Sequence, residues 1–308
     1  MCLPVYKWHR AILLSALLIL FCKLSNAAPI SSDGSAAIWF DVSKTAHLLA
    51  LLFFSGLFFL FVWRGKKGRA LYIRPIDAMD KMTDAIGRAA EMGTPILYAP
   101  GLGSLTDPVT VASLNILSKV SEKGARLHTR TLVPNYGPLT WPVAQEVVRQ
   151  AFVRAGRSGE YNPDDVPYFT SRSFTYAAAT VGMMQREKTA SNFFIGHFYS
   201  ESLILTENGA ASGALQIGGT DSVEQLPFFI TTCDKVMIGE EIFAASALVT
   251  DDPVSRSVVK ASDWFKVAVL IVFALALVAA IIQALAGDEF LRSHSLEWIA
   301  AFTSGEWL

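Results

Sequence analysis

Residues 95–108 read PILYAPGLGSLTDP, and this stretch decides how the central part of the chain folds. Its apolar start, 95–99, predicts a short buried strand, and glycines at 101 and 103 predict a turn directly after it. Asp107 followed by Pro108 predicts a helix start, because aspartate is a favoured cap and proline suits the first helical position. A strand, a glycine turn and a helix in this order form one unit of an α/β fold.

The same alternation continues on both sides of this stretch. Residues 156–165, GRSGEYNPDD, predict a surface loop, and Asp252 with Pro253 predicts a helix that runs into the C-terminal apolar segment. The spacing predicts a Rossmann-like α/β domain over 64–262, with a mainly parallel sheet and helices on both faces. Helices are expected over 76–90, 107–124 and 140–156, and further strands at 71–73, 127–133, 166–170, 193–198, 214–218 and 228–233.

Two long apolar segments bracket this domain. Neither 46–63 nor 267–286 contains an Asp, Glu, Lys or Arg. Crossing the hydrocarbon core of a bilayer takes about 20 apolar residues in a helix. We therefore expect transmembrane helices at 46–63 and 263–287, the alternative for each being a buried core helix. Because both segments lack internal charges, a transporter or an ion pump is not expected.

The N-terminal segment has the three parts of a secretory signal peptide. Basic residues are followed by an apolar run at 11–21 and by small residues at 25–28. We predict a signal peptide over 1–27, with a retained anchor as the alternative.

Basic residues at the segment borders predict the orientation. They are Arg64, Lys66, Lys67 and Arg69 on one side of the domain and Arg256, Lys260 and Lys266 on the other. Lysine and arginine stay preferentially in the cytoplasm. The domain is thus expected in the cytosol, within a multi-pass protein of the inner membrane. Residues 28–45 and an interfacial tail at 288–308 are expected outside.

The net charge and the cysteines bear on two more kinds of site, one for nucleic acid and one for zinc. A formal net charge of −1 gives no reason to expect nucleic acid as a partner, because binding it requires a basic surplus. The three cysteines form no CxxC pair, so no zinc site is predicted. Cys233 is expected to pack as a small apolar residue.

Four stretches between Leu71 and Asp252 are similar to the sequences of a known protein family. They are APGLGSLTD, TLVPNYGP, IGHFYSES and CDKVMIGEE. With the bounding apolar segments, they resemble a prokaryotic family of membrane proteins known only as a domain of unknown function. The resemblance implies a cytosolic α/β domain between two transmembrane helices, and it implies no activity, cofactor or site residue.

Glycine turns at predicted strand ends are candidate ligand sites. Gly101, Gly103 and Ser104 follow one strand, and Gly218 with Gly219 follows another. Backbone N–H groups in such turns bind anions. A dinucleotide fingerprint is incomplete here, so the alternative is a simple tight turn, and no cofactor is identified. Asp221, after the second turn, is expected to cap a helix.

His197 and Glu201 are weak candidates for catalysis. Both stand near the end of a predicted strand, and a histidine with a carboxylate can transfer protons. Two such residues do not make a metal site, and Ser200 is not in a nucleophile motif. A hydrogen-bonded structural histidine is the alternative.

Ala276, Ala280 and Ala284 form a small-residue stripe that lets transmembrane helices approach closely. The leading hypothesis is a membrane-anchored scaffold or assembly protein whose domain self-associates or binds another membrane protein. One alternative is a membrane-tethered domain that binds or senses an anionic or nucleotide-like molecule. Another is an enzyme that uses His197 and Glu201.

Overall fold

The computed structural model describes residues 45–66, 74, 76–250 and 253–286. The chain divides into two compact units, one formed by Ala70–Val259 and the other by Met1–Arg69 with Lys260–Leu308. The predicted signal peptide, the segment before residue 45, the C-terminal tail and the strand at 71–73 lie outside the described residues.

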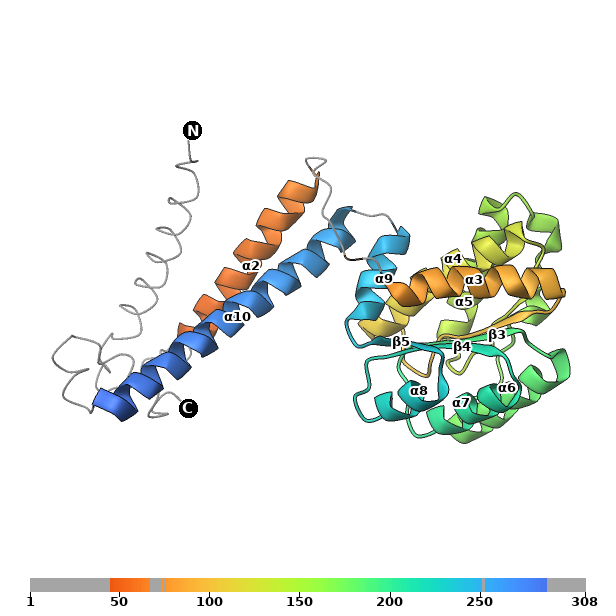
Figure 1. The fold of residues 1–308 in the computed structure, drawn as a ribbon. Coiled ribbons are helices and arrows are strands. Elements are labelled where there is room, and N and C mark those ends of the chain that lie inside the picture. Colours follow the sequence, from red (N-terminus) through yellow and green to blue (C-terminus); the bar gives the residue numbers. More distant parts are fainter. Residues whose placement is uncertain (1–44, 67–73, 75, 251–252, 287–308) are drawn as a thin grey trace, which may run out of the picture. The chain divides into compact units, whose positions relative to one another are not determined.

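The α/β unit is built on a five-stranded sheet in the order β2-β1-β3-β4-β5 (Figure 1). Every neighbouring pair of strands is parallel. The predicted α/β class with a parallel sheet is therefore confirmed. The strands are β1 (Ile96–Ala99), β2 (Thr131–Leu132), β3 (Ser191–Ile195), β4 (Leu215–Thr220) and β5 (Lys235–Ile238).

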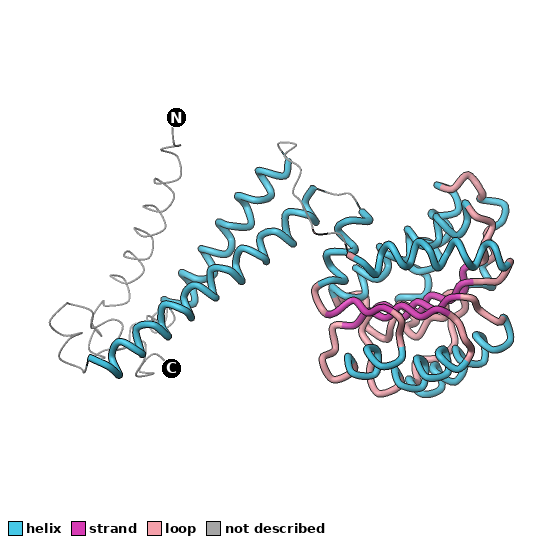
Figure 2. The backbone as a smooth tube through the Cα atoms, viewed as in Figure 1, coloured by secondary structure: helices cyan, strands magenta, loops and turns pink. Residues whose placement is uncertain are grey.

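Helices cover both faces of the sheet, as Figure 2 shows. Alternate residues of each strand point to opposite faces. Tyr98 and Phe193 pack on the first face, and Leu97 and Phe194 on the second. The first face carries α3 (Asp77–Met92), α4 (Pro108–Arg126), α5 (Thr140–Arg154) and α9 (Glu241–Thr250). The second carries α6 (Ser173–Glu187), α7 (Ser202–Ala211) and α8 (Leu226–Thr232).

Local sequence accounts for α3 and α4. In α3, the buried residues include Met82, Ile86 and Ala89, which recur at helical spacing on one side, and Gly93 ends the helix with a φ of 64°. The predicted start of α4 is confirmed, since Pro108 is its first residue and Asp107 precedes it.

Two of the predicted strands, 228–233 and 166–170, are not strands in the structure. The apolar run 228–233 lies mostly in helix α8, and the last strand is β5, at Lys235–Ile238. Pro227 stands in the first turn of α8, where its missing N–H costs nothing. Residues 166–170 do not form a regular strand, although Tyr168 makes an isolated bridge to Asn135.

The strand predicted at 127–133 is shorter than expected. Only Thr131 and Leu132 are assigned to β2, because His128 turns the chain with a φ of 58° after α4. The predicted loop at 156–165 contains two 3-10 turns, Ser158–Glu160 and Pro163–Asp165. Asp165 is nearly buried and pairs with Arg130, at 2.6 Å, so this loop is tied to the end of α4 and β2.

The second unit contains α2 (Thr45–Lys66) and most of α10 (Pro253–Ala286). Two ring contacts join these helices: Phe54 with Phe265, at 5.1 Å between centroids, and Phe61 with Trp264, at 6.5 Å. Within the described residues, no helix qualifies by length and hydropathy as a membrane span. Ala276, Ala280 and Ala284 belong to α10, and their side chains lie outside the described part.

Candidate functional site

The sheet has a topological switch point between β1 and β3. From β1 the chain proceeds to β2 on one side, and β3 then pairs with β1 on the other. In open parallel sheets, ligands bind in the crevice that this reversal leaves outside the carboxyl ends of the strands. Here the loops after β1 and β3 form that edge.

These two loops are in direct contact. The Leu102 N–H donates a hydrogen bond to the His197 carbonyl oxygen, at 2.8 Å. Gly101 has a φ of 86°, and a Cβ there would lie 2.7 Å from the same oxygen. A Cβ at Gly196 would overlap the Pro100 carbonyl. Glycine is thus required at both positions for the loops to meet.

The turn before α4 encloses Gly103. Ser104 N–H donates to Asp107 Oδ2 at 2.7 Å, and Asp107 N–H donates back to the Ser104 carbonyl at 3.1 Å. A Cβ at Gly103 would collide with Thr110 Oγ1 and would lie 3.3 Å from His197 Cβ. Gly101, Gly103 and Ser104 therefore do lie in a turn between strand and helix, beside His197.

His197 pairs with Asp221, which follows β4. Its Nδ1 lies 2.7 Å from Asp221 Oδ1, and the two side chains are 27% and 34% exposed. An ionised carboxylate can only accept, so Nδ1–H of His197 donates to Asp221, and this bond fixes the orientation of the ring. Tyr199 contacts the imidazole edge to face, with 4.8 Å between ring centroids. The arrangement presents an oriented imidazole beside a partly exposed ring.

Glu201 belongs to the same loop but makes different bonds. Its side chain is fully buried, and Oε1 accepts the N–H of Tyr199 at 2.7 Å. Oε2 has no hydrogen-bond partner in the described structure. The hydrogen-bonded carboxylate partner of His197 is Asp221, not the predicted Glu201.

Asp221, Gly218 and Gly219 do not have the local structure that the sequence predicted. Asp221 does not cap a helix, since α8 begins only at Leu226. Gly218 and Gly219 lie inside β4, paired on both sides, and do not form the predicted turn. Gly218 instead makes room for the ring of Phe229 and for Cys233 Sγ. Because β4 continues to Thr220, its end brings Asp221 beside the end of β3.

The chain matches the family described as Domain of unknown function (DUF6754) over residues 35–291. It belongs to this family. The match includes α2, the α/β unit and α10. No curated protein and no solved structure matches the chain. The predicted membership of a family known as a domain of unknown function is confirmed.

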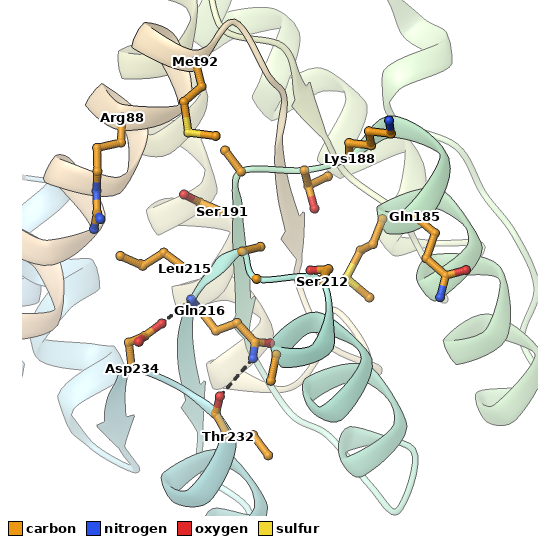
Figure 3. A pocket seen from close by; sticks show the side chains of 16 residues that line it. Arg88, Met92, Gln185, Lys188, Ser191, Ser212, Leu215, Gln216, Thr232 and Asp234 are labelled. Carbon is orange, nitrogen blue, oxygen red and sulfur yellow. Dashed lines mark hydrogen bonds between the residues drawn. The ribbon is translucent and has the colours of Figure 1, made fainter.

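A cavity of about 800 Å³ opens at the opposite edge of the DUF6754 sheet, beside the starts of β3 and β4 (Figure 3). Gln216 N–H donates to Asp234 Oδ2 at 2.8 Å, and Gln216 Nε2 donates to the Thr232 carbonyl at 2.9 Å. These polar groups join the start of β4 to the segment before β5. Arg88 and Lys188 also line the cavity, and Figure 3 shows them on different sides of it.

No group of three or more His, Cys, Asp and Glu side chains suited to a metal ion occurs in the described part of the DUF6754 chain. The switch point does bring together the imidazole of His197, the carboxylate of Asp221 and the ring of Tyr199. Sequence reasoning found His197 and missed its bond to Asp221. The position of both residues directly after a strand was the signal available.

Proposed function

We propose that the α/β unit is a small-molecule binding or sensory domain whose ligand lies at the carboxyl ends of β1, β3 and β4. The observation that carries this proposal is the partly exposed His197–Asp221 pair at the topological switch point. The Leu102 N–H holds the His197 backbone, and the bond to Asp221 orients its ring, so a ligand would meet a preformed group.

Unused hydrogen-bonding capacity at this edge supports the proposal. Thr110 Oγ1 and Glu201 Oε2 are buried and have no partner among the described residues. A buried polar atom without a partner costs free energy, about 1–3 kcal/mol. A ligand or water that satisfies such atoms recovers part of that cost.

We further propose that α2 and α10 anchor the domain in the inner membrane, with 64–262 in the cytosol and 288–308 outside. Large apolar side chains are exposed along both helices, among them Phe59 at 68% and Phe273 at 71%. Large apolar side chains exposed along a helix call for lipid or for a protein partner. The uncharged segments and their basic borders favour lipid.

A scaffold that self-associates is the second candidate function. The observation that favours it is the same exposed apolar surface of α2 and α10, which a second copy or another membrane protein can cover. Native mass spectrometry of the full-length chain from mild detergent distinguishes the two. A homo-oligomer supports the scaffold, and a monomer at all concentrations removes self-association from it.

Ligand binding is tested by thermal unfolding of the full-length chain in detergent, screened against small metabolites. A compound that binds the native state raises the melting temperature with its concentration. We expect the increase to disappear in Asp221→Asn and to persist in Asp84→Asn. Asp84 is an exposed residue of α3, so this control makes the same chemical change elsewhere.

The design separates a true site from general stabilisation. Hits that stabilise Asp221→Asn as strongly as the native chain would show that they bind elsewhere. A screen in which neither chain responds to any compound would end the proposal. No hydrogen bond in the described structure joins His197 to Glu201, so the geometry does not support an enzyme that uses these two residues as a pair.

A further inference from the structure

The charge of the loops at the carboxyl edge limits what the proposed site can bind. The loops after the five strands are 100–107, 133–139, 196–201, 221–225 and 239–240, and none of them contains Lys or Arg. Their acidic residues are Asp107, Glu201, Asp221, Glu224 and Glu240. A phosphate or carboxylate placed here would meet like charge on these loops, which is unfavourable.

Arg74 and Arg172 lie near these loops in the described structure but do not reverse that balance. Arg74 is paired with Glu241 at 2.9 Å. Arg172, just before α6, is exposed, and the five carboxylates of the loops outnumber its single positive charge. The expected anionic or nucleotide-like ligand is therefore disfavoured by the residues at the strand ends.

Three side chains around the switch point supply hydrogen-bond acceptors. Asp221 and Glu201 are carboxylates, and in the neutral tautomer of His197 whose Nδ1–H donates to Asp221, Nε2 is an acceptor as well. Glu201 Oε2, buried and without a partner in the described structure, adds an acceptor that is still unused. Such a set is complementary to a ligand that donates, which means an N–H or O–H group.

Exposed apolar side chains accompany these acceptors. Tyr199 is 53% exposed beside His197, Val223 is 78% exposed two residues after Asp221, and Leu139 is 75% exposed before α5. An aromatic ring attracts a cation through its face, and apolar neighbours cover a hydrocarbon skeleton. The described residues hold no cluster of metal-ligating side chains, so an organic cation fits this edge better than a metal ion.

We propose that the carboxyl edge of the sheet binds a small organic amine in its protonated form. The ammonium group donates to Asp221 and to the neighbouring acceptors, and the hydrocarbon part lies on the exposed ring of Tyr199. This inference rests on the proposed ligand-binding function and adds the chemical class of the ligand to it.

Three probes with one skeleton test the charge preference: 2-phenylethylamine, 2-phenylethanol and 3-phenylpropionate. Each is titrated by calorimetry into the full-length chain in detergent, with empty micelles as the blank. We expect the amine to bind about tenfold more tightly than the carboxylate, because charge-assisted hydrogen bonds are the strong ones. Asp221→Asn should weaken amine binding by about the same factor, and should leave binding of the alcohol unchanged.

Asp84→Asn is the matched control, and it should bind all three probes as the native chain does. Tighter binding of 3-phenylpropionate, strengthened further by Asp221→Asn, would overturn the amine and leave the ligand site standing. Equal binding of the three probes, or no binding of the amine, would also overturn it. The metabolite screen with Asp221→Asn then decides separately whether the site binds anything at all.

Discussion

The Leu102 amide and the His197 carbonyl are joined by a hydrogen bond of 2.8 Å between the loops that follow β1 and β3. This bond fixes the loop that carries the imidazole against the turn that precedes α4. It is possible only because Gly101 and Gly196 have no side chain where the two backbones meet. The same contact therefore determines both how the two loops pack and where His197 lies in the proposed site.

Gly101→Ala is expected to destabilise the α/β unit. Alanine at a φ of 86° is strained, at a cost of about 1–2 kcal/mol, and its Cβ would also press on the His197 carbonyl, 2.7 Å away. The free energy of unfolding of the full-length chain, measured with denaturant, should fall by more than the strain alone. Gly156→Ala isolates the strain, since φ is 74° there and nothing lies within 4 Å.

Gly159→Ala completes the series, because this glycine has neither a positive φ nor a close neighbour. It should leave stability nearly unchanged. Equal losses for Gly101→Ala and Gly156→Ala would show that the loops separate easily, contrary to the packing described.

The Cys233 thiol should make stability fall at alkaline pH. Burial raises its pKa from the ordinary value of 9.0 to about 12, so the folded state holds the proton more tightly than the unfolded state. This contribution is fully present below pH 9 and is lost as the pH rises from 9 toward 12. The unfolding free energy of the native chain should thus fall more steeply over this range than that of Cys233→Ala. Identical slopes would contradict the burial of the thiol.

Arg130→Gln should destabilise the chain through the carboxylate that it leaves behind. Asp165 is only 9% exposed, and Arg130 holds it at 2.6 Å while also reaching Glu187 at 3.1 Å. Because the arginine itself is half exposed, we expect a loss of about 1–2 kcal/mol, below the cost of breaking a fully buried pair. Denaturant unfolding measures it. Arg149→Gln removes the partner of the exposed Glu146 and should have no measurable effect.

Local signals predicted the parts of the fold that depend on neighbouring residues. β1, its glycine turn and the start of α4 follow from 95–108 alone. The run 228–233, FFITTC, was misassigned because its aromatic and β-branched residues favour a strand, whereas packing against β4 selects helix α8. The bond from His197 to Asp221 spans 24 positions and depends on strand order, which composition and spacing do not contain.

The membrane proposal predicts that the chain stays with the membrane pellet after extraction with alkaline carbonate. Phe273 is 71% exposed on α10, so Phe273→Arg should place a charge in lipid and lower the pelleted fraction, at a cost of about 2.5–3.5 kcal/mol near the bilayer centre. Phe174→Arg changes a residue of α6 that is 57% exposed and should leave the pelleted fraction unchanged. Release of the native chain into the supernatant would remove the anchor and would leave the switch-point site untouched, because that site lies wholly within Ala70–Val259.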